Sequence, residues 1–267
     1  TKIIFEGPEN KLNLTENTQP AVFLASYCIF QIIKKEFGYN FNKFKYFAGH
    51  SLGEYSALAC VGSISFEDTL KILQKRGKFM QEAVPNGEGA MLAVIGMASK
   101  ELDKILDTNK KKYECFIAND NSNLQVVVSG LKKDINLLSD DLNNKKIKNL
   151  KLNVSAPFHC KYMKIASEKM SSYINDLNMN ELEKPIISNV TAKETRSSKE
   201  IKSLLISQIE KKVRWLESVE YMINNGVNNF VEIGPGKVLS GLIKRINKNV
   251  NINSINSEED IKLLIND

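Results

Sequence analysis

Apolar and polar positions along the first third of the chain follow two different spacings. Helical spacing of apolar residues predicts a helix over residues 19–37, with Pro20 in its first turn, where the missing N–H is not needed. A short aromatic run over residues 44–49, flanked by a turn, predicts a buried strand. Ser65, with Asp68 three residues later, is typical of a capped helix start. Two further helices are therefore predicted, over residues 52–61 and 65–84.

The middle of the chain has a different order of predicted elements. Residues 89–154 contain them in the order strand, helix, strand, strand, helix, strand, which is typical of a ferredoxin-like subdomain. The predicted strands cover residues 90–95, 114–118, 125–129 and 147–154, and the helices cover residues 99–106 and 132–142.

The last third returns to alternating helices and strands. Helices are predicted over residues 160–177, 200–209, 215–224 and 237–246, and strands over residues 185–190 and 229–233. Such alternation is typical of a parallel sheet covered by helices. We therefore expect an α/β protein whose hydrolase-like parallel-sheet core, residues 1–88 and 155–267, carries the ferredoxin-like subdomain, residues 89–154, as an insert.

Composition excludes several classes of protein. Of the 267 residues, 42% are hydrophobic and 25% are charged, a globular mixture that argues against disorder. The longest apolar run, residues 21–30, is too short to span a bilayer. With two His and widely spaced Cys, neither a metal site nor a disulfide framework is expected, and a reducing compartment is favoured. The cysteines are Cys28, Cys60, Cys115 and Cys160.

The net charge of +6 is spread along the chain and mixed with acidic residues. A nucleic-acid-binding protein would carry a dense basic stripe, and none is visible here. The charge fits weak binding of an acidic protein partner better. We therefore expect no nucleic-acid partner and no membrane association.

The most informative motif surrounds Ser51. Gly49, Ser51 and Gly53 form G-x-S-x-G between a predicted strand and a predicted helix, the setting of a nucleophile elbow. We expect crowding at the flanking glycines, a strained backbone at the serine, and the N–H of Leu52 available to a developing oxyanion. The alternative is a glycine-rich turn with an incidental serine, since this motif is common by chance.

A serine nucleophile needs a base, and the chain has two histidines. His50 is the neighbour of Ser51 in sequence, so its side chain is expected to point away from the hydroxyl and to be packed in the core. His159 follows the insert near a predicted strand end, where the active sites of open α/β sheets gather. A neutral imidazole there could accept the Ser51 proton; the alternative is a solvated residue at a helix start.

Five spaced motifs give the chain a family resemblance. It resembles malonyl-CoA:acyl-carrier-protein transacylases, the loading enzymes of type II fatty-acid synthesis, over nearly its whole length. The resemblance implies a hydrolase-like core with a ferredoxin-like insert. The motifs are Gly49-His50-Ser51-Leu52-Gly53-Glu54-Tyr55, Arg76-Gly77-Lys78-Phe79-Met80-Gln81, Ala156-Pro157-Phe158-His159, Trp215-Leu216-Glu217-Ser218-Val219 and Glu232-Ile233-Gly234-Pro235-Gly236.

The resemblance also implies roles for individual residues. Ser51 would accept the malonyl group, His159 would be its base, and Arg76 would pair with the malonyl carboxylate through two hydrogen bonds. The backbone carbonyl of Gln208 would orient His159, so the Gln208 side chain is expected not to matter. The alternative for Arg76 is a solvated charge on a helix face. The resemblance places Gln19 and Asn119 around the acyl pocket, and capping of a helix start and of a loop explains these two about as well. His50 and Phe158 are also assigned to substrate binding.

The sequence departs from the family pattern in two places. The family normally begins with a strand and a Gly-Gln-Gly-x-Gln loop whose Gln supplies a second oxyanion N–H, and neither is present. Losing one such donor costs roughly 10²- to 10³-fold in rate, so we expect a segment upstream of Thr1. Lys212 stands where the family usually has Pro, which should alter a loop and leave the chemistry unchanged.

The function implied is ping-pong transfer of malonyl from malonyl-CoA to the phosphopantetheine thiol of acyl carrier protein, by a monomer without bound cofactor or metal. Three alternatives stay open: a serine thioesterase or lipase-like hydrolase, an inactive carrier-binding module, and a methylmalonyl or mixed-specificity acyltransferase. Phe158, beside the base, disfavours the last. The Lys-, Asn- and Ile-rich composition is compatible with a bacterial cytoplasm or with a plastid-type stroma after removal of a transit peptide.

Overall fold

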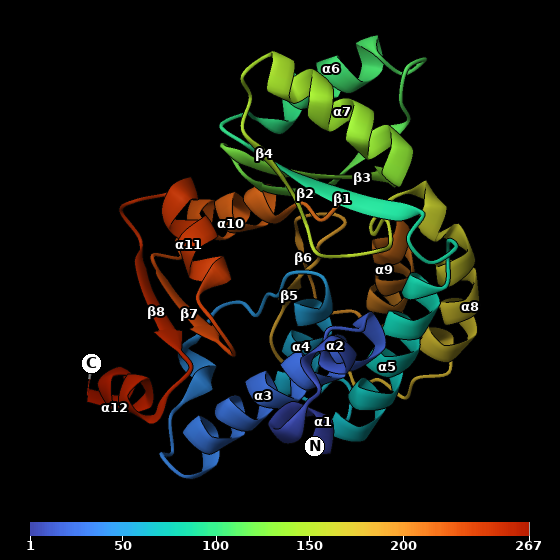
Figure 1. The fold of residues 1–267 in the computed structure, drawn as a ribbon. Helices are drawn as coiled ribbons and strands as arrows, with labels where there is room; N and C mark the ends of the chain where they lie inside the picture. Colours follow the sequence, from blue (N-terminus) through green and yellow to red (C-terminus); the bar gives the residue numbers. More distant parts are fainter. Residues whose placement is uncertain (267) are drawn as a thin grey trace.

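The computed structural model describes residues 1–266 and shows a mixed α/β protein in which a small sheet with two helices lies beside a larger, mainly helical body (Figure 1). The largest cluster of buried apolar residues in the body includes Phe23, Leu58 and Leu73, which are fully buried. Burial of apolar surface of this kind is the main stabilising contribution to folding. Five helices surround this core: α3 (Thr15–Lys35), α4 (Leu52–Cys60), α5 (Phe66–Gln81), α8 (Lys164–Asn175) and α9 (Ser198–Glu210).

The small sheet has the order of elements that the sequence predicts. Its four strands are antiparallel in the order β2-β3-β1-β4, and α6 and α7 cover the same face (Figure 1). The other face, which includes Met91 and Val127, packs toward Phe158 and so toward the body. The elements are β1 (Gly89–Ile95), α6 (Ser99–Thr108), β2 (Cys115–Ser122), β3 (Gln125–Leu131), α7 (Lys132–Asn144) and β4 (Asn149–Lys151).

The predicted parallel sheet is present only in pieces. The segment 44–49 is not a regular strand: Phe47 forms a single parallel bridge with Ile186, the first residue of β5 (Ile186–Ile187). Farther along the chain, β7 (Asn229–Ile233) pairs in parallel with β8 (Asn251–Ile255).

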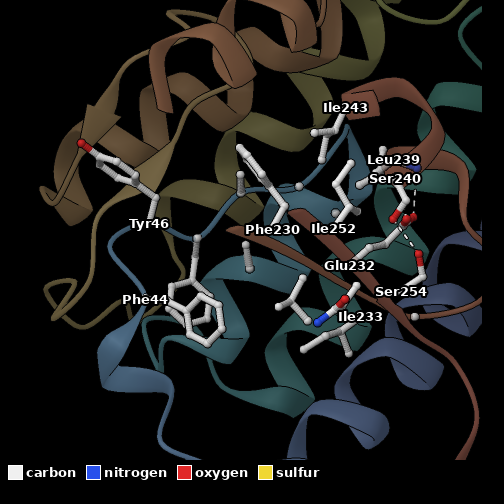
Figure 2. Close-up of a pocket in the computed structure, with 18 of the residues that line it drawn as sticks. Phe44, Tyr46, Phe230, Glu232, Ile233, Leu239, Ser240, Ile243, Ile252 and Ser254 are labelled. Atoms are coloured by element: carbon white, nitrogen blue, oxygen red, sulfur yellow. Dashed lines mark hydrogen bonds between the residues drawn. The ribbon is translucent and has the colours of Figure 1, made fainter. Parts of the chain in front are cut away.

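A cavity of about 1300 Å³ lies between these parallel pieces. Phe44 and Tyr46 line one side, and Phe230 of β7 and Ile252 of β8 line the other (Figure 2). Over the described residues, a continuous parallel sheet through both segments is therefore a wrong prediction.

Some helix boundaries differ from those predicted, and one agrees with its prediction. The helix α3 begins at Thr15, so Pro20 lies inside it and not in its first turn. Helix α5 begins as expected, because the Ser65 hydroxyl accepts a hydrogen bond from the Asp68 N–H at 3.0 Å. The helix predicted over residues 160–177 is shorter, consisting of η2 (Lys161–Met163) and α8.

The remaining elements complete the C-terminal half and the two ends of the chain. The bounds of α10 and β7 match the predicted ones, whereas five elements at the ends or edges were not predicted. Helices α10 (Trp215–Asn224) and α11 (Val238–Ile246) were predicted. The five elements that were not predicted are α1 (Lys2–Glu6), α2 (Glu9–Leu12), β6 (Glu194–Thr195), β8 and α12 (Glu258–Asn266). A short 3-10 turn, η1 (Phe41–Lys43), precedes the elbow. Within residues 1–266, no helix combines the length and apolar character that crossing a membrane requires.

Candidate active site

Ser51 occupies a sharp turn at the start of α4. Its backbone has φ 53° and ψ −108°, a conformation that is costly for a residue with a side chain. Gly49 makes the turn possible, because a Cβ there would lie 2.0 Å from the carbonyl oxygen of Gly53. Gly53 itself has open space at that position. Of the two flanking glycines, only Gly49 is therefore required by crowding.

His159 lies against the Ser51 hydroxyl. Its Nε2 is 2.8 Å from Ser51 Oγ, and its Nδ1 is 2.8 Å from the carbonyl oxygen of Gln208, in the last turn of α9. A carbonyl can only accept, so Nδ1 carries the proton and Nε2 is left as an acceptor. The imidazole is thus oriented to take a proton from the serine.

Burial keeps the His159 imidazole neutral. The ring is 5% exposed, and desolvation, followed by the nearby charge of Arg76, lowers the pKa of His159 to about 3. Its φ of 57° places it on an unusual backbone bend after Phe158. At neutral pH the ring therefore holds its lone pair ready at Nε2.

Arg76 reaches the same hydroxyl from α5. Its side chain is buried, and its Nη2 donates to Ser51 Oγ at 3.0 Å. Nη1 donates to the Gln19 side chain at 2.7 Å, and Nε has no partner in the described structure. No carboxylate of residues 1–266 lies within ion-pair distance of this guanidinium. A buried cation held only by neutral groups favours an anionic ligand.

The Gln208 side chain also contacts the site, which the sequence analysis did not predict. Its Oε1 accepts from Arg76 Nη2 at 2.8 Å, and its Nε2 donates to the carbonyl of Ser51 at 3.0 Å and to Glu54 Oε2 at 2.7 Å. The side chain is fully buried. The family resemblance implied a role only for the backbone carbonyl of Gln208. Nothing in the sequence near Gln208 indicates the contacts of its side chain.

Glu54 is a buried carboxyl that the sequence reasoning quoted in a motif without giving it a role. Its Oε2 accepts from the Gln208 side chain and from the backbone N–H of Asn189 at 3.1 Å, and its Oε1 has no partner in the described structure. Desolvation raises the pKa of Glu54 to about 7, against the lowering effect of these hydrogen bonds and of Arg76.

We expect Glu54→Gln to change how stability depends on pH. Since the folded pKa of Glu54 is raised, the wild type loses stability as pH rises from about 4.5 to about 7. The variant has no such proton to lose, so its stability relative to the wild type should rise by about 3 kcal/mol across that window. Urea unfolding of both proteins at several pH values measures this difference, and a difference that is independent of pH would contradict the raised pKa.

The other predicted site residues are distributed around this centre. The Leu52 N–H, in the first turn of α4, donates no hydrogen bond within residues 1–266. The His50 ring is turned away from Ser51 toward the Asn121 side chain, with Nε2 2.9 Å from its oxygen. Phe158 is half-buried between the body and the small sheet. Asn119 lies in β2, and none of the described hydrogen bonds joins its side chain to Ser51.

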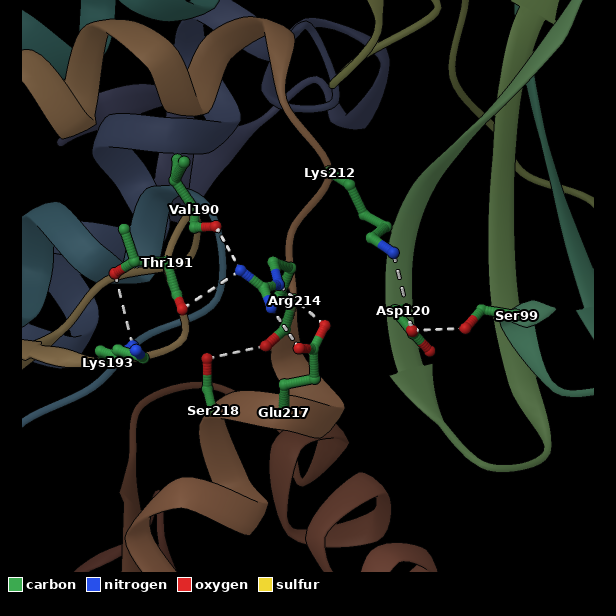
Figure 3. Close-up of polar contacts among 9 residues, drawn as sticks. All are labelled: Ser99, Asp120, Val190, Thr191, Lys193, Lys212, Arg214, Glu217 and Ser218. Atoms are coloured by element: carbon green, nitrogen blue, oxygen red, sulfur yellow. Dashed lines mark hydrogen bonds and ion pairs between the residues drawn. The ribbon is translucent and has the colours of Figure 1, made fainter. Parts of the chain in front are cut away.

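The loop after α9 attaches the site to the small sheet. Val213 forms a parallel bridge with Asn119, and Lys212 Nζ lies 3.9 Å from Asp120 Oδ2 (Figure 3). Arg214 pairs with Glu217 at the start of α10 (Figure 3). The position where the family usually has Pro is therefore an ordered connection between the two parts. Among the described residues, no group of His, Cys, Asp and Glu side chains could hold a metal ion.

Comparison with known proteins places the chain in a family. The sequence profile described as "Acyl transferase domain" matches residues 1–261. The malonyl CoA-acyl carrier protein transacylase of Bacillus subtilis is 40% identical over 267 residues, covering 99% of this chain and 83% of the relative. The crystal structure of an acyl-carrier-protein S-malonyltransferase from Bartonella henselae superposes with a TM-score of 0.95 at 39% identity, over 99% of this chain and 85% of that one.

One similar structure contains a partner. It is a type II PKS acyl-carrier protein in complex with its malonyl-transacylase, and it matches with a TM-score of 0.94 at 36% identity, over 99% of this chain and 85% of that one. The similarity in sequence and in structure extends over nearly the whole chain. The chain therefore belongs to the acyl transferase family and, within it, to the malonyl CoA-acyl carrier protein transacylases.

Proposed function

We propose that this protein transfers a malonyl group from malonyl-CoA to the phosphopantetheine thiol of acyl carrier protein through a malonyl ester of Ser51. The observation that carries the proposal is the position of Ser51 Oγ, 2.8 Å from a neutral His159 Nε2 and 3.0 Å from the buried guanidinium of Arg76. A nucleophile, its base and an unpaired cation for a carboxylate thus meet at one atom. The relatives named above carry the same activity in their names.

In the first half of the reaction, the serine is acylated. Ser51 Oγ attacks the thioester carbonyl while its proton passes to His159 Nε2, and the Leu52 N–H stabilises the oxyanion. When the C–S bond breaks, the CoA sulfur leaves with the proton held by His159. In the second half, the pantetheine thiol gives its proton to His159 and attacks the ester carbonyl. The C–O bond to Ser51 then breaks, and Ser51 regains the proton.

Arg76 would select the acyl group. Arg76 has no carboxylate partner among the described residues, so the malonyl carboxylate can bind it. The two carboxylate oxygens match the two parallel N–H groups of a guanidinium. An acetyl group has no such charge and would leave Arg76 buried without an anion. Phe158, on the half-buried bend before His159, would limit the space for an added methyl group. Gln19 and Gln208 would hold the guanidinium in place.

We expect Arg76→Ala to remove the preference for malonyl-CoA. The loss of a two-pronged charged contact should lower kcat/KM for malonyl-CoA by about 10²- to 10³-fold, and that for acetyl-CoA much less. Acyl transfer to the carrier protein measured with both thioesters gives the ratio. Lys78→Ala, at an exposed position of the same helix, is the matched control. Equal effects on the two substrates would support a hydrolase-like site in which Arg76 does not select the acyl group.

The same proposal implies a carrier-protein partner, an oligomeric state and a cellular compartment. The acidic carrier protein would dock on Lys and Arg side chains in a salt-sensitive encounter, as a net charge of +6 favours. The protein would act as a monomer, without nucleic acid, membrane, cofactor or metal. The relative from Bacillus subtilis supports a bacterial cytoplasm, with a plastid-type stroma as the other setting.

We also propose the finer description of the fold. Residues 89–154 form a ferredoxin-like subdomain, supported by their element order and the strand order β2-β3-β1-β4. Residues 1–88 and 155–267 form a hydrolase-like catalytic core, supported by the elbow between an extended segment and α4. The site lies where these two parts meet.

A further inference from the structure

The side chain of Asn189 bonds to both sides of the turn that carries Ser51. Its Oδ1 accepts from the Ser51 N–H at 2.7 Å, and its Nδ2 donates to the Gly49 carbonyl at 2.8 Å. These groups belong to the two peptide bonds that flank His50. We infer that Asn189 is a positioning residue, which holds the nucleophile in its reactive backbone conformation. The inference rests on the proposed role of Ser51 and assigns a residue beyond those that act on the acyl group.

Only one orientation of the Asn189 amide satisfies its surroundings. A backbone N–H can only donate and a carbonyl can only accept, so the oxygen must face Ser51 and the nitrogen must face Gly49. The Gln208 Nε2, 3.5 Å from Oδ1, is a donor on the same side. An amide is therefore the group required, because it offers an acceptor and a donor side by side. Asn189 is 1% exposed, so water cannot replace either hydrogen bond if the amide is lost.

Asn189 is itself fixed from two sides. Its N–H donates to Glu54 Oε2 on α4, the helix that begins at the elbow, at 3.1 Å. Its carbonyl accepts from the Arg214 N–H at 2.9 Å. The Arg214 guanidinium donates to the next two carbonyls, those of Val190 and Thr191, at 3.2 Å each (Figure 3). The buried Glu54 carboxyl thus acts on the nucleophile through Asn189.

The two hydrogen bonds of the Asn189 side chain explain how the strained turn at Ser51 stays in place. A residue in the conformation of Ser51 costs roughly 1–3 kcal/mol and persists only when its surroundings hold it. Without the two hydrogen bonds the turn can relax, which would move Oγ away from His159 Nε2. A displacement of about 1 Å at a reacting atom can cost about 10²-fold in rate.

Two substitutions separate positioning from general support of the fold. Asn189→Ala removes both hydrogen bonds at every pH. In Asn189→Asp, a charged carboxylate can accept from Ser51 but not donate to Gly49, whereas a protonated carboxyl can do both. Burial favours protonation of this Asp in mild acid, while His159 stays neutral because its pKa is about 3. The charged or titratable groups around the position are Glu54 on α4, Arg76 on α5, His159 before η2 and Arg214 before α10.

The test is the single-turnover rate of Ser51 acylation by labelled malonyl-CoA between about pH 8 and about pH 5.5, measured as a ratio to the wild type. We expect Asn189→Ala to be about 10²-fold slow throughout, with KM changed much less than kcat. Asn189→Asp should be equally slow at high pH and recover tenfold or more at low pH. Ser188→Ala, the neighbouring loop residue whose hydroxyl accepts only from the Val190 N–H, should keep the wild-type rate.

Each outcome decides between two separate claims. Absence of labelled Ser51 in the wild type would overturn the proposed function. A labelled wild type together with a wild-type rate in Asn189→Ala, or with a pH-independent loss in Asn189→Asp, would overturn the positioning role alone. Should Asn189→Ala fail to fold, the comparison between high and low pH within Asn189→Asp still decides, because it is made on one protein.

Discussion

Replacing Ser51 with Ala should abolish malonyl transfer, lowering kcat by about 10⁴-fold or more. The hydroxyl is the only group of the elbow that touches both His159 Nε2 and the Arg76 guanidinium, so no neighbouring oxygen can replace it. Binding of malonyl-CoA should persist, because Arg76 keeps its contacts with Gln19 and Gln208. Transfer to the carrier protein and equilibrium binding of malonyl-CoA, measured on the same preparation, separate the two effects.

The matched control for this substitution is Ser56→Ala. Ser56 lies on the same helix, α4, and lines the large cavity away from His159. It should transfer malonyl at the wild-type rate. A Ser51→Ala protein that retains more than a trace of transfer would mean that another group carries the acyl chain or that transfer is direct.

Replacing His159 with Gln should lower kcat by about 10²- to 10⁴-fold, the usual contribution of general acid–base catalysis. A Gln side chain can still hydrogen bond Ser51 but cannot hold a proton between the steps. The loss should be larger for the first half-reaction at neutral pH, since the alcohol of Ser51 is a far weaker acid than a thiol. Stopped-flow release of CoA measures that step.

The other histidine provides the comparison. His50→Gln should retain most of the rate, because its ring is bonded to Asn121 and not to Ser51. In the wild type, kcat/KM should show no decline from protonation of His159 between pH 8 and pH 5, because its pKa is about 3. Equal losses in His159→Gln and His50→Gln would contradict the assignment of the base.

Local patterns were sufficient to predict some parts of the fold and not others. The small sheet was predicted because its strands and helices follow one another with clear apolar spacing, and the elbow because G-x-S-x-G stands between a predicted strand and a predicted helix. The strand over residues 44–49 was predicted from its apolar character, but strand formation depends on partners, and only Phe47 has one. Edge strands such as β8 depend on such long-range pairing as well.

The hydrogen-bond network around Ser51 could not be predicted from the sequence. Glu54, Asn189 and the Gln208 side chain are polar residues in segments that carry no spacing or motif to show that they meet. The folded chain brings them together from α4, a loop and α9, and their burial is what gives the contacts their importance. The one available signal was Glu54 itself, because a carboxylate next to Gly53 in an otherwise apolar helix needs hydrogen-bond partners if it is buried.

The most direct test of the account is the mass of the protein after exposure to malonyl-CoA without carrier protein. We predict that one malonyl group is bound, that peptide mapping places it on Ser51, and that adding the carrier protein with its phosphopantetheine removes it as malonyl-carrier. Ser56→Ala should behave in the same way, and Ser51→Ala should bind no malonyl group covalently. Full-rate formation of malonyl-carrier by a wild-type protein that never carries malonyl on Ser51 would contradict the account.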